Sequence, residues 1–515
     1  MQKQKKHVAS KRISKNCIVA LLSLVLFSTV LMIPMGAEAG TREHGYTYNY
    51  DYWEDVQDSP DFYNPAKVLT SVDLGLDKNF SGPSGLTVFG DKMYICDSGN
   101  NRIVEFDILD AENLQLSRVI EEVKGTDPAT FSNPTDIAVS VDGNLFICDQ
   151  GNNRVIKVDP ELNHLVTFVK PTDSALDPQL AFQPKKLVVD TAERVYCIAT
   201  GINKGLCKYE PDGVFSGFIG ATPASYDFLD YIWKKFASQE QRAQMEAFVP
   251  TEYDNIVMDN EGFIYAVTSA STEDDLRTET ADAVRKLNLL GNDILVRNGN
   301  YPVYGDLYWG DGAGHEGPSL FSDVCVFDND IYACLDRNRG RVFAYDDQGR
   351  MVFAFGGNGN MDGYFRNPVG IATYGHNLYV LDSLDCAVTV FVPTEFGSLV
   401  YEAIEEFDEG DYDASGKLWE DVMAQNGNYD LAYIGIGRSL LRQEKYHEAM
   451  EYFELKYDDE NYSKAFKQYR KEWVEEHIVI IVIVLLAVFL IPLGIGRYKK
   501  IKHDIDTADI FVINS

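Results

Sequence analysis

The sequence predicts a mainly β chain, in which a six-bladed β-propeller is followed by a small α-helical segment and one transmembrane helix. The main observation is a repeat: DSGNNRIVEFD at 97–107 and DQGNNRVIKVD at 149–159 are nearly the same string, and DRNRGRVFAYD at 336–346 keeps their Asp, Arg and closing Asp. Self-similarity at a period of roughly 50 residues is typical of stacked supersecondary units. The second observation is an uncharged run of Ile, Val and Leu near the C-terminus.

Each repeat has the pattern of antiparallel strands. In the second one, the apolar run 137–141 is followed by an Asp-Gly turn and a returning run at 145–149, and RVIKVD at 154–159 then alternates apolar and polar residues. The six units begin at Pro83, Pro134, Pro184, Tyr253, Phe321 and Pro368. Because an open sheet of so many strands would leave exposed edges, we expect closure into a ring of four-stranded blades.

These units resemble NHL repeats, a family of six-bladed propellers whose blades carry a strand ending in YVxDSGNNR and then an apolar strand. Residues 94–107 and 146–159 match this pattern closely, and 332–346 and 379–391 match it in part. The third unit departs from it, with Thr200 where Asp is expected. The resemblance implies the fold and little about function, because propellers carry many activities.

The two ends of the repeat region predict how the ring closes. The strand-like run 68–74 precedes the first unit and has no partner there, whereas the sixth unit ends one strand short, after 389–393. An N-terminal strand that completes the last blade would hide both edges. The propeller is therefore expected over 62–393, preceded by an aromatic-rich linker over 40–61.

The N-terminus has the pattern of an export signal. Six Lys and Arg residues precede an apolar run from about Cys17 to Met35, and Ala37-Glu38-Ala39 offers small residues at a cleavage site. Residues 1–39 are predicted to be a secretory signal peptide, with an uncleaved anchor as the alternative.

Residues 478–496 carry no charge and are long enough to span a bilayer. The positive charges of Arg497, Lys499, Lys500 and Lys502 follow at once and mark the cytoplasmic side. We therefore expect a single-pass protein of the cell membrane, in a bacterial envelope, with an extracellular propeller and a cytoplasmic tail over 497–515.

A helical neck is predicted over 396–474. It resembles tetratricopeptide repeats, because 410–422 and 444–456 are offset by the 34-residue period of that family and Tyr412 matches Tyr446. The segment is either a stalk that leads to the membrane or a small peptide-binding module.

Composition limits the possible partners. The formal net charge of −33 disfavours nucleic acid and anionic lipid as ligands. The eight Cys do not form a disulfide framework, since Cys96 and Cys148 recur at one blade position, as packing residues would.

Aligning the units places six residues at the start of the innermost strands, where they should ring one mouth of the channel: Gly85, Asp136, Lys186, Asn255, Asp323 and Gly370. Asp136 and Asp323 come from units three apart and should face each other across the axis. With Lys186 and Asn255 they could hold Ca²⁺ or a polar ligand. The alternative is that these residues are solvated and cap the ends of strands.

The sequence shows few of the site residues that enzymes of related folds use. The family includes amidating lyases that hold zinc with histidines, yet His164, His315 and His376 all lie away from the ring positions. Lactonases on related folds use carboxylates and an Asn around calcium, but no matching motif surrounds the ring. The chain is expected not to be an enzyme and to need no cofactor.

Three long insertions, at 220–250, 269–282 and 298–318, belong to connections on one face of the ring. The third carries Tyr301, Tyr304, Tyr308 and Trp309, which could anchor a ligand or pack the loops together. We expect this face to bind a protein partner, as an accessory subunit of a surface complex or transporter. The alternatives are a glycan or cell-wall ligand, or a calcium-dependent lactonase or lyase activity.

Overall fold

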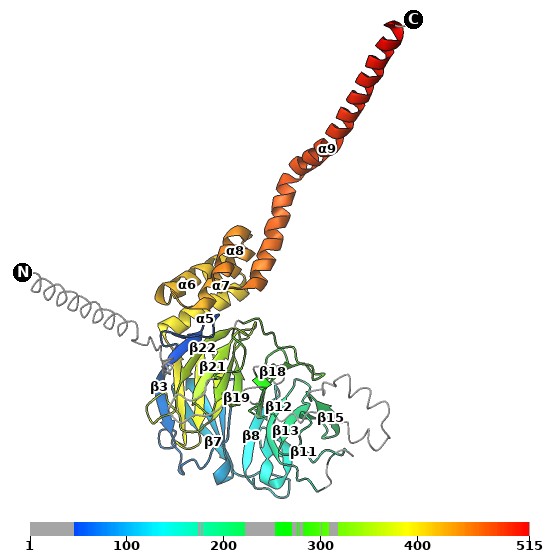
Figure 1. The fold of residues 1–515 in the computed structure, drawn as a ribbon. Helices are drawn as coiled ribbons and strands as arrows, with labels where there is room; N and C mark the ends of the chain where they lie inside the picture. The colour runs from blue at the N-terminus through cyan, green and yellow to red at the C-terminus, as the bar shows by residue number, and fades with distance from the viewer. Residues whose placement is uncertain are drawn as a thin grey trace, which may run out of the picture.

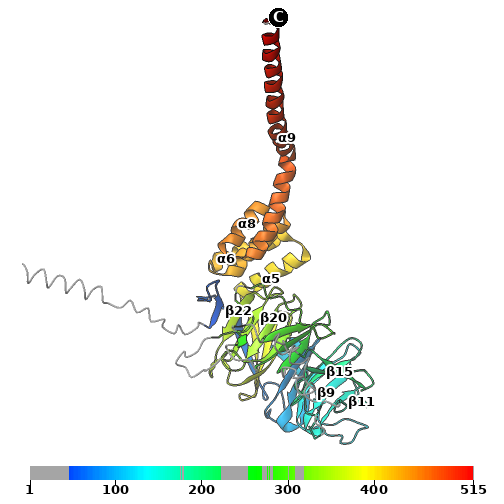
Figure 2. The same ribbon diagram turned by 45° about the vertical axis from the view of Figure 1, so that its right-hand side comes forward.

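The computed structural model describes residues 46–513, except 174–175, 177–178, 222–252, 270–274, 277, 279–281, 300 and 308–317. Over this part of the chain, six antiparallel sheets form a ring, a group of helices stands on it, and one long helix continues away from the ring (Figures 1 and 2). The predicted mainly β class and the six-bladed propeller are confirmed. The predicted signal peptide at 1–39 lies outside the described residues.

The first three blades each have four strands in sequence order. Their bounds are β4 Gly85–Phe89, β5 Lys92–Asp97, β6 Arg102–Asp110, β7 Asn113–Ile120; β8 Pro134–Val139, β9 Leu145–Asp149, β10 Arg154–Val158, β11 His164–Phe168; β12 Pro184–Val189, β13 Val195–Ala199, β14 Leu206–Tyr209 and β15 Phe215–Ile219. Successive side chains of each strand point to opposite faces of the blade, and apolar side chains on these faces pack against the neighbouring blades. This packing forms most of the core.

The other three blades are less regular. Among the described residues the fourth has three strands, the fifth has four with two added at its outer edge, and the sixth has three with one contributed from the N-terminal side. Their bounds are β16 Asn255–Met258, β17 Ile264–Val267, β18 Val284–Leu287; β19 Phe321–Val326, β20 Tyr332–Asp336, β21 Arg341–Tyr345, β22 Met351–Gly356; β23 Pro368–Tyr374, β24 Asn377–Asp382 and β25 Ala387–Pro393.

The ring closes where the sequence predicts, although the closing strand is displaced. Strand β3 (Tyr63–Thr70) pairs antiparallel with β25, with Val68 opposite Thr389. The strand therefore ends at Thr70, and 71–74 are not part of it. The reason is a turn: Asp73 accepts hydrogen bonds from the backbone N–H and the hydroxyl of Thr70, at 3.0 and 2.6 Å.

Part of the expected linker forms two strands. β1 (Thr47–Tyr50) pairs with β22 of the fifth blade, and β2 (Val56–Asp58) pairs with β1, so the two extend that sheet outward. Tyr48 is fully buried there, and its hydroxyl donates to Asp306 at 2.8 Å. The alternating aromatic side chains of this segment supply an apolar face that the blade edge covers.

The repeated DSGNNR motif has a structural role. Arg102 Nε donates to Asp97 Oδ2 at 2.7 Å, and Arg154 repeats this contact with Asp149 at 2.8 Å. Between them the backbone makes a 3-10 turn that ends in a left-handed Asn, at Asn101 in the first blade. Because both carboxylates are fully buried, each ion pair fixes the link between the second and third strands of its blade.

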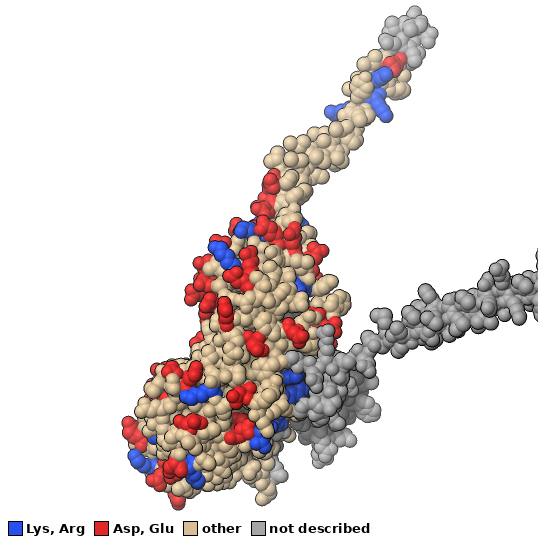
Figure 3. Space-filling view, turned by 90° about the vertical axis from the view of Figure 1, so that its left-hand side faces the viewer, with Lys and Arg blue, Asp and Glu red and all other residues tan. Residues whose placement is uncertain are grey.

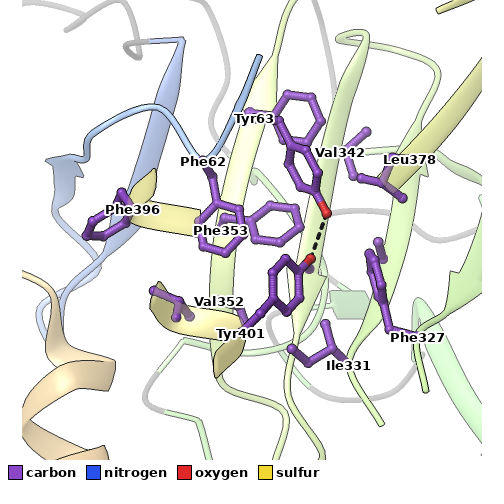
Figure 4. Packing of buried hydrophobic residues seen from close by; sticks show 14 of the residues in the cluster. Phe62, Tyr63, Phe327, Ile331, Val342, Val352, Phe353, Leu378, Phe396 and Tyr401 are labelled. Atoms are coloured by element: carbon purple, nitrogen blue, oxygen red, sulfur yellow. Dashed lines mark hydrogen bonds between the residues drawn. The ribbon is translucent and has the colours of Figure 1, made fainter. Parts of the chain in front are cut away.

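The neck consists of α5 (Glu395–Glu409), α6 (Tyr412–Gln425), α7 (Asp430–Arg442) and α8 (Tyr446–Leu455), each packed on the next. Figure 4 shows how α5 docks on the ring: Tyr401 packs among Phe62, Tyr63 and side chains of the fifth and sixth blades, and the two tyrosine hydroxyls are 2.7 Å apart. Tyr429 Oη also donates to the carbonyl of Val352 at 2.7 Å. These buried contacts fix the neck to the propeller.

Helix α9 (Asp459–Ile513) follows α8 and is long and apolar enough to cross a membrane. Its apolar window has a mean hydropathy of 3.4 and is not buried in the protein. Figure 3 shows acidic side chains over the propeller and neck, then an uncharged stretch of α9, then a group of Lys and Arg. Pro492 lies inside this helix, and α9 is not straight in Figure 1.

Candidate functional site

The channel of the propeller holds a cavity of about 790 Å³. All six innermost strands line it, from the predicted ring residues Asp136, Lys186, Asn255 and Asp323 at one end to the turns at the other. Because these strands are the inner edges of their sheets, they present backbone N–H and C=O groups to the cavity. The cavity thus combines apolar walls with polar edges, a composition suited to a ligand site.

The four polar ring residues lie together at one end of this cavity, as the alignment of the units predicts. They are only 3–6 % exposed, so they are not the solvated strand caps of the alternative hypothesis. In the second, third and fifth blades the strand register shifts just before this position, between the first residue of the strand and the ring residue. This register shift turns the side chains of Asp136, Lys186 and Asp323 toward the channel.

Asp136 and Lys186 form an ion pair across neighbouring blades. Lys186 Nζ lies 3.5 Å from Asp136 Oδ1, and Asp136 Oδ2 accepts the backbone N–H of Leu187 at 2.9 Å. Burial raises the pKa of Asp136, and the ammonium group of Lys186 opposes that rise. Burial lowers the pKa of Lys186, but Asp136 and Asp323 outweigh it, so the net pKa is raised and the side chain is a cation.

Asp323 joins three blades. It accepts a hydrogen bond from Asn255 Nδ2 of the fourth blade, from the N–H of Val324, and at 2.7 Å from the N–H of Ile371 in the sixth blade. Burial raises the pKa of Asp323 to about 7, against the opposing effect of Lys186. Its oxygens are therefore already occupied by the protein, as are those of Asp136.

The two remaining ring positions must be glycine. A Cβ at Gly85 would lie 2.6 Å from the carbonyl oxygen of Thr135, and one at Gly370 would lie 2.9 Å from Cβ of Leu86. At these two positions the first blade lies too close to the second and sixth blades for any side chain to fit. The ring is therefore formed by the four polar residues alone.

The other end of the cavity has an acidic rim. The lining includes Asp91, Asp190, Asp259, Glu261 and Asp328, which come from the turns between the first and second strands of four blades. Two of these acids are paired: Arg194 Nε lies 2.7 Å from Asp190, and Lys286 Nζ lies 3.3 Å from Asp259. These acids are not among the binding residues predicted from the sequence, which lie toward the opposite face, although an acid recurs in most of these turns.

The neck stands beside this rim. The hairpin turn of the sixth blade contributes Tyr374 to the cavity lining, and the next residues hold α5: the ring of His376 stacks on Tyr401 at 4.2 Å, and its Nε2 lies 2.7 Å from Glu405. A second hollow, of about 480 Å³, lies between α5, α7 and the turns of the fifth blade, and Asp328 lines both hollows. We call this second hollow the neck groove.

The aromatic anchors predicted on the third insertion are not exposed. Tyr301 and Tyr304 are 6 % and 5 % exposed, and Tyr301 stacks on Tyr50 with the ring centroids 3.8 Å apart. The expectation of accessible anchors is therefore wrong for these two, because they bury the N-terminal strand against the fifth blade. Tyr308 and Trp309 lie outside the described residues, as do most of the insertion 220–250 and part of 269–282.

Within the described ranges, no group of three or more His, Cys, Asp and Glu side chains could hold a metal ion. Of the propeller histidines that the structure describes, His164 and His376 do not line the cavity. Cys96 and Cys148 are buried and unpaired, in keeping with a packing role.

Comparison with known proteins gives the blade type and a distant relative. The family model described as NHL repeat matches residues 131–157, which span the start of the second blade to its third strand. A Caenorhabditis elegans protein named as a probable peptidyl-alpha-hydroxyglycine alpha-amidating lyase, pgal-1, is 27% identical over 151 residues. That match spans 27% of this chain and 42% of the relative.

Two solved structures are also similar to this chain, at low identity and low TM-score. Virginiamycin B lyase from Staphylococcus aureus is 12% identical, over 64% of this chain and 89% of the lyase, with a TM-score of 0.35. Hydrazine synthase of Kuenenia stuttgartiensis is also 12% identical, over 62% and 97%, with a TM-score of 0.35. The NHL-repeat match thus lies in the second blade, and the similarity to the amidating lyase covers only part of each chain.

Proposed function

We propose that this chain is a single-pass membrane protein whose extracellular propeller binds a protein partner on the face that carries the channel rim and the neck, as a subunit of a surface complex. The observation that carries the proposal is the position of the 790 Å³ cavity beside a neck that is fixed by buried contacts and continues into α9. A ligand held there is coupled rigidly to the membrane helix.

The membrane anchor is supported by the flanks of the apolar stretch in α9. Trp473 precedes it and Tyr498 follows it, and aromatic side chains favour the two interfaces of a bilayer. The cluster from Arg497 to Lys502 favours a cytoplasmic C-terminus. Between Asp459 and the apolar stretch the helix is about 28 Å long, at 1.5 Å per residue, so the neck is held clear of the lipid surface.

A binding role is favoured over catalysis because the buried carboxylate of Asp323 is committed to hydrogen bonds that join blades. Among the described residues, no histidine lines the cavity that could act as a base or a zinc ligand. Two observations favour a lyase activity as the second candidate: the partial similarity to pgal-1, and the pKa of about 7 at Asp323, which suits an acid–base group. For the glycan alternative, two of the predicted anchors, Tyr301 and Tyr304, are buried.

The test is co-purification of the full chain from detergent-solubilised membranes. A partner should co-purify with the unaltered chain in constant ratio and be lost from a Glu261→Arg, Asp328→Arg variant that folds normally. As a control, Glu112→Arg, Glu161→Arg reverses two exposed acids on the first and second blades. Equal recovery from both variants would overturn the proposal, and turnover of a peptide ending in α-hydroxyglycine to its amide would favour the lyase instead.

A further inference from the structure

The neck groove places like charges opposite each other. Seven acids and one base line it: Asp328, Asp330, Asp346, Asp347, Glu405, Asp408, Glu409 and Arg438. The acids of α5 come from one side and those of the fifth-blade turns from the other. Burial raises the pKa of Asp408 to about 6, and Asp347, Asp330 and Glu405 add to the rise while Arg438 opposes it.

Most of these acids have no cation of their own. Asp346 pairs with Arg350 at 3.7 Å and Glu405 with His376. Asp328 and Asp347 instead accept hydrogen bonds from the neutral amides of Asn260 and Gln348, at 2.9 and 2.6 Å. The guanidinium of Arg438 lies over the ring of Phe407, at 4.4 Å from the centroid. By contrast, Asp97 and Asp149 of the blades each pair with a buried Arg.

The groove and the channel rim form one acidic surface. Asp328 lines both hollows. Burial raises the pKa of Asp330, opposed by Lys286 and reinforced by Glu261 and Asp259 of the rim and by Asp347 of the groove. Charges of the two hollows therefore act on each other, and the surface extends from the neck into the channel.

The groove also has apolar walls. Ile404, Phe407, Trp419 and Leu431 line it beside the acids. Aliphatic stems of Lys and Arg pack on such surfaces while the charged ends reach carboxylates, and aromatic faces attract cations. The combination fits long cationic side chains better than it fits an inorganic cation, which needs several oxygens at one point.

We propose that the neck groove and the channel rim together bind one extended cationic segment, a Lys- or Arg-rich stretch of the partner protein. This inference rests on the proposed function and names the chemistry of its partner. The complementary charge is the reason for this choice of occupant, because the carboxylates facing each other across the groove repel until a cationic segment lies between them.

The experiment measures binding of a fluorescently labelled peptide of alternating Lys and Gly to the full chain in detergent micelles. Affinity should fall steeply with added salt and be weakened roughly tenfold or more by Asp330→Asn, Asp347→Asn, Asp408→Asn. The matched control, Glu112→Gln, Glu121→Gln, Glu161→Gln, removes the same charge from exposed sites outside the groove and should change affinity less than about twofold.

A second readout separates loss of binding from loss of folding. Since the triple Asn variant removes repulsion, its melting temperature near neutral pH should rise rather than fall. Equal weakening by both variants would overturn the inference, as would displacement of the peptide by Ca²⁺ alone at low concentration. If the peptide does not bind while a partner still co-purifies in a rim-dependent manner, this inference fails and the proposed function stands; if neither occurs, both fail.

Discussion

The buried carboxyl of Asp323 is expected to make the stability of the propeller depend on pH. Its pKa is raised from 3.8 to about 7 by burial, so the folded chain holds a proton over a range in which the unfolded chain has released it. A state that binds more protons is favoured at low pH, so this group contributes full stability below about pH 4 and loses it as the pH rises to about 7. The rise in pKa corresponds to roughly 4 kcal/mol, at about 1.4 kcal/mol per pH unit.

The measurement is the free energy of unfolding of the full chain in micelles between about pH 5 and about pH 8.5. Asp323→Asn should lower stability by about 1–3 kcal/mol at the acid end, because one backbone N–H loses its acceptor, and should flatten the pH profile. Asp110→Asn is the control: Asp110 is exposed, and hydrogen bonds from Asn113 lower its pKa, so it titrates below this range. An unchanged slope in Asp323→Asn would refute the argument.

Four further outcomes are expected. Tyr401→Phe should destabilise the docked neck by about 1 kcal/mol, seen as faster proteolysis between ring and neck, because the buried hydroxyl pair with Tyr63 is lost. Asp149→Ala should cost about 3–5 kcal/mol in thermal or chemical unfolding, since Arg154 would stay buried without its partner. Tyr301→Ala should lower the melting temperature instead of acting only on ligand binding, as a core substitution does. Protease added to intact cells should remove the propeller and spare a tag placed after Ser515; protection of the propeller would reverse the proposed topology.

The fold was predictable because its signals are local. Asp97 and Arg102 are five residues apart, and their pairing is repeated at Asp149 and Arg154, so the sequence itself shows the blade motif. The ring residues were predictable for a related reason: each occupies the same place in its own repeat, and the repeats are related by rotation about one axis.

The burial of Tyr301 could not be found in this way, because its partner Tyr50 lies some 250 positions earlier, in a segment that shows no repeat. The neck groove depends on a contact of the same kind. Its acids come from α5 and from two turns of the fifth blade, and only the docking of the neck brings them together. The acidic strings DND at 328–330 and EEFDEGD at 405–411 were the available signal, but neither indicates the other as its neighbour.

Two opposing interactions act where the neck docks on the ring: apolar packing and repulsion between carboxylates. Their balance bears on function. Phe62, Phe396 and Tyr401 bury an apolar contact that holds α5 on the ring, whereas Asp408 and Asp330 face each other a short distance away and oppose it. A stalk that served only as a spacer would gain stability from neutral residues at these positions. The apolar contact is large enough to hold the neck despite the repulsion, which leaves a preformed, negatively charged groove between two rigid parts. Its position next to the channel and beside the neck that continues into α9 agrees with the proposed function, in which the ligand itself supplies the missing positive charge.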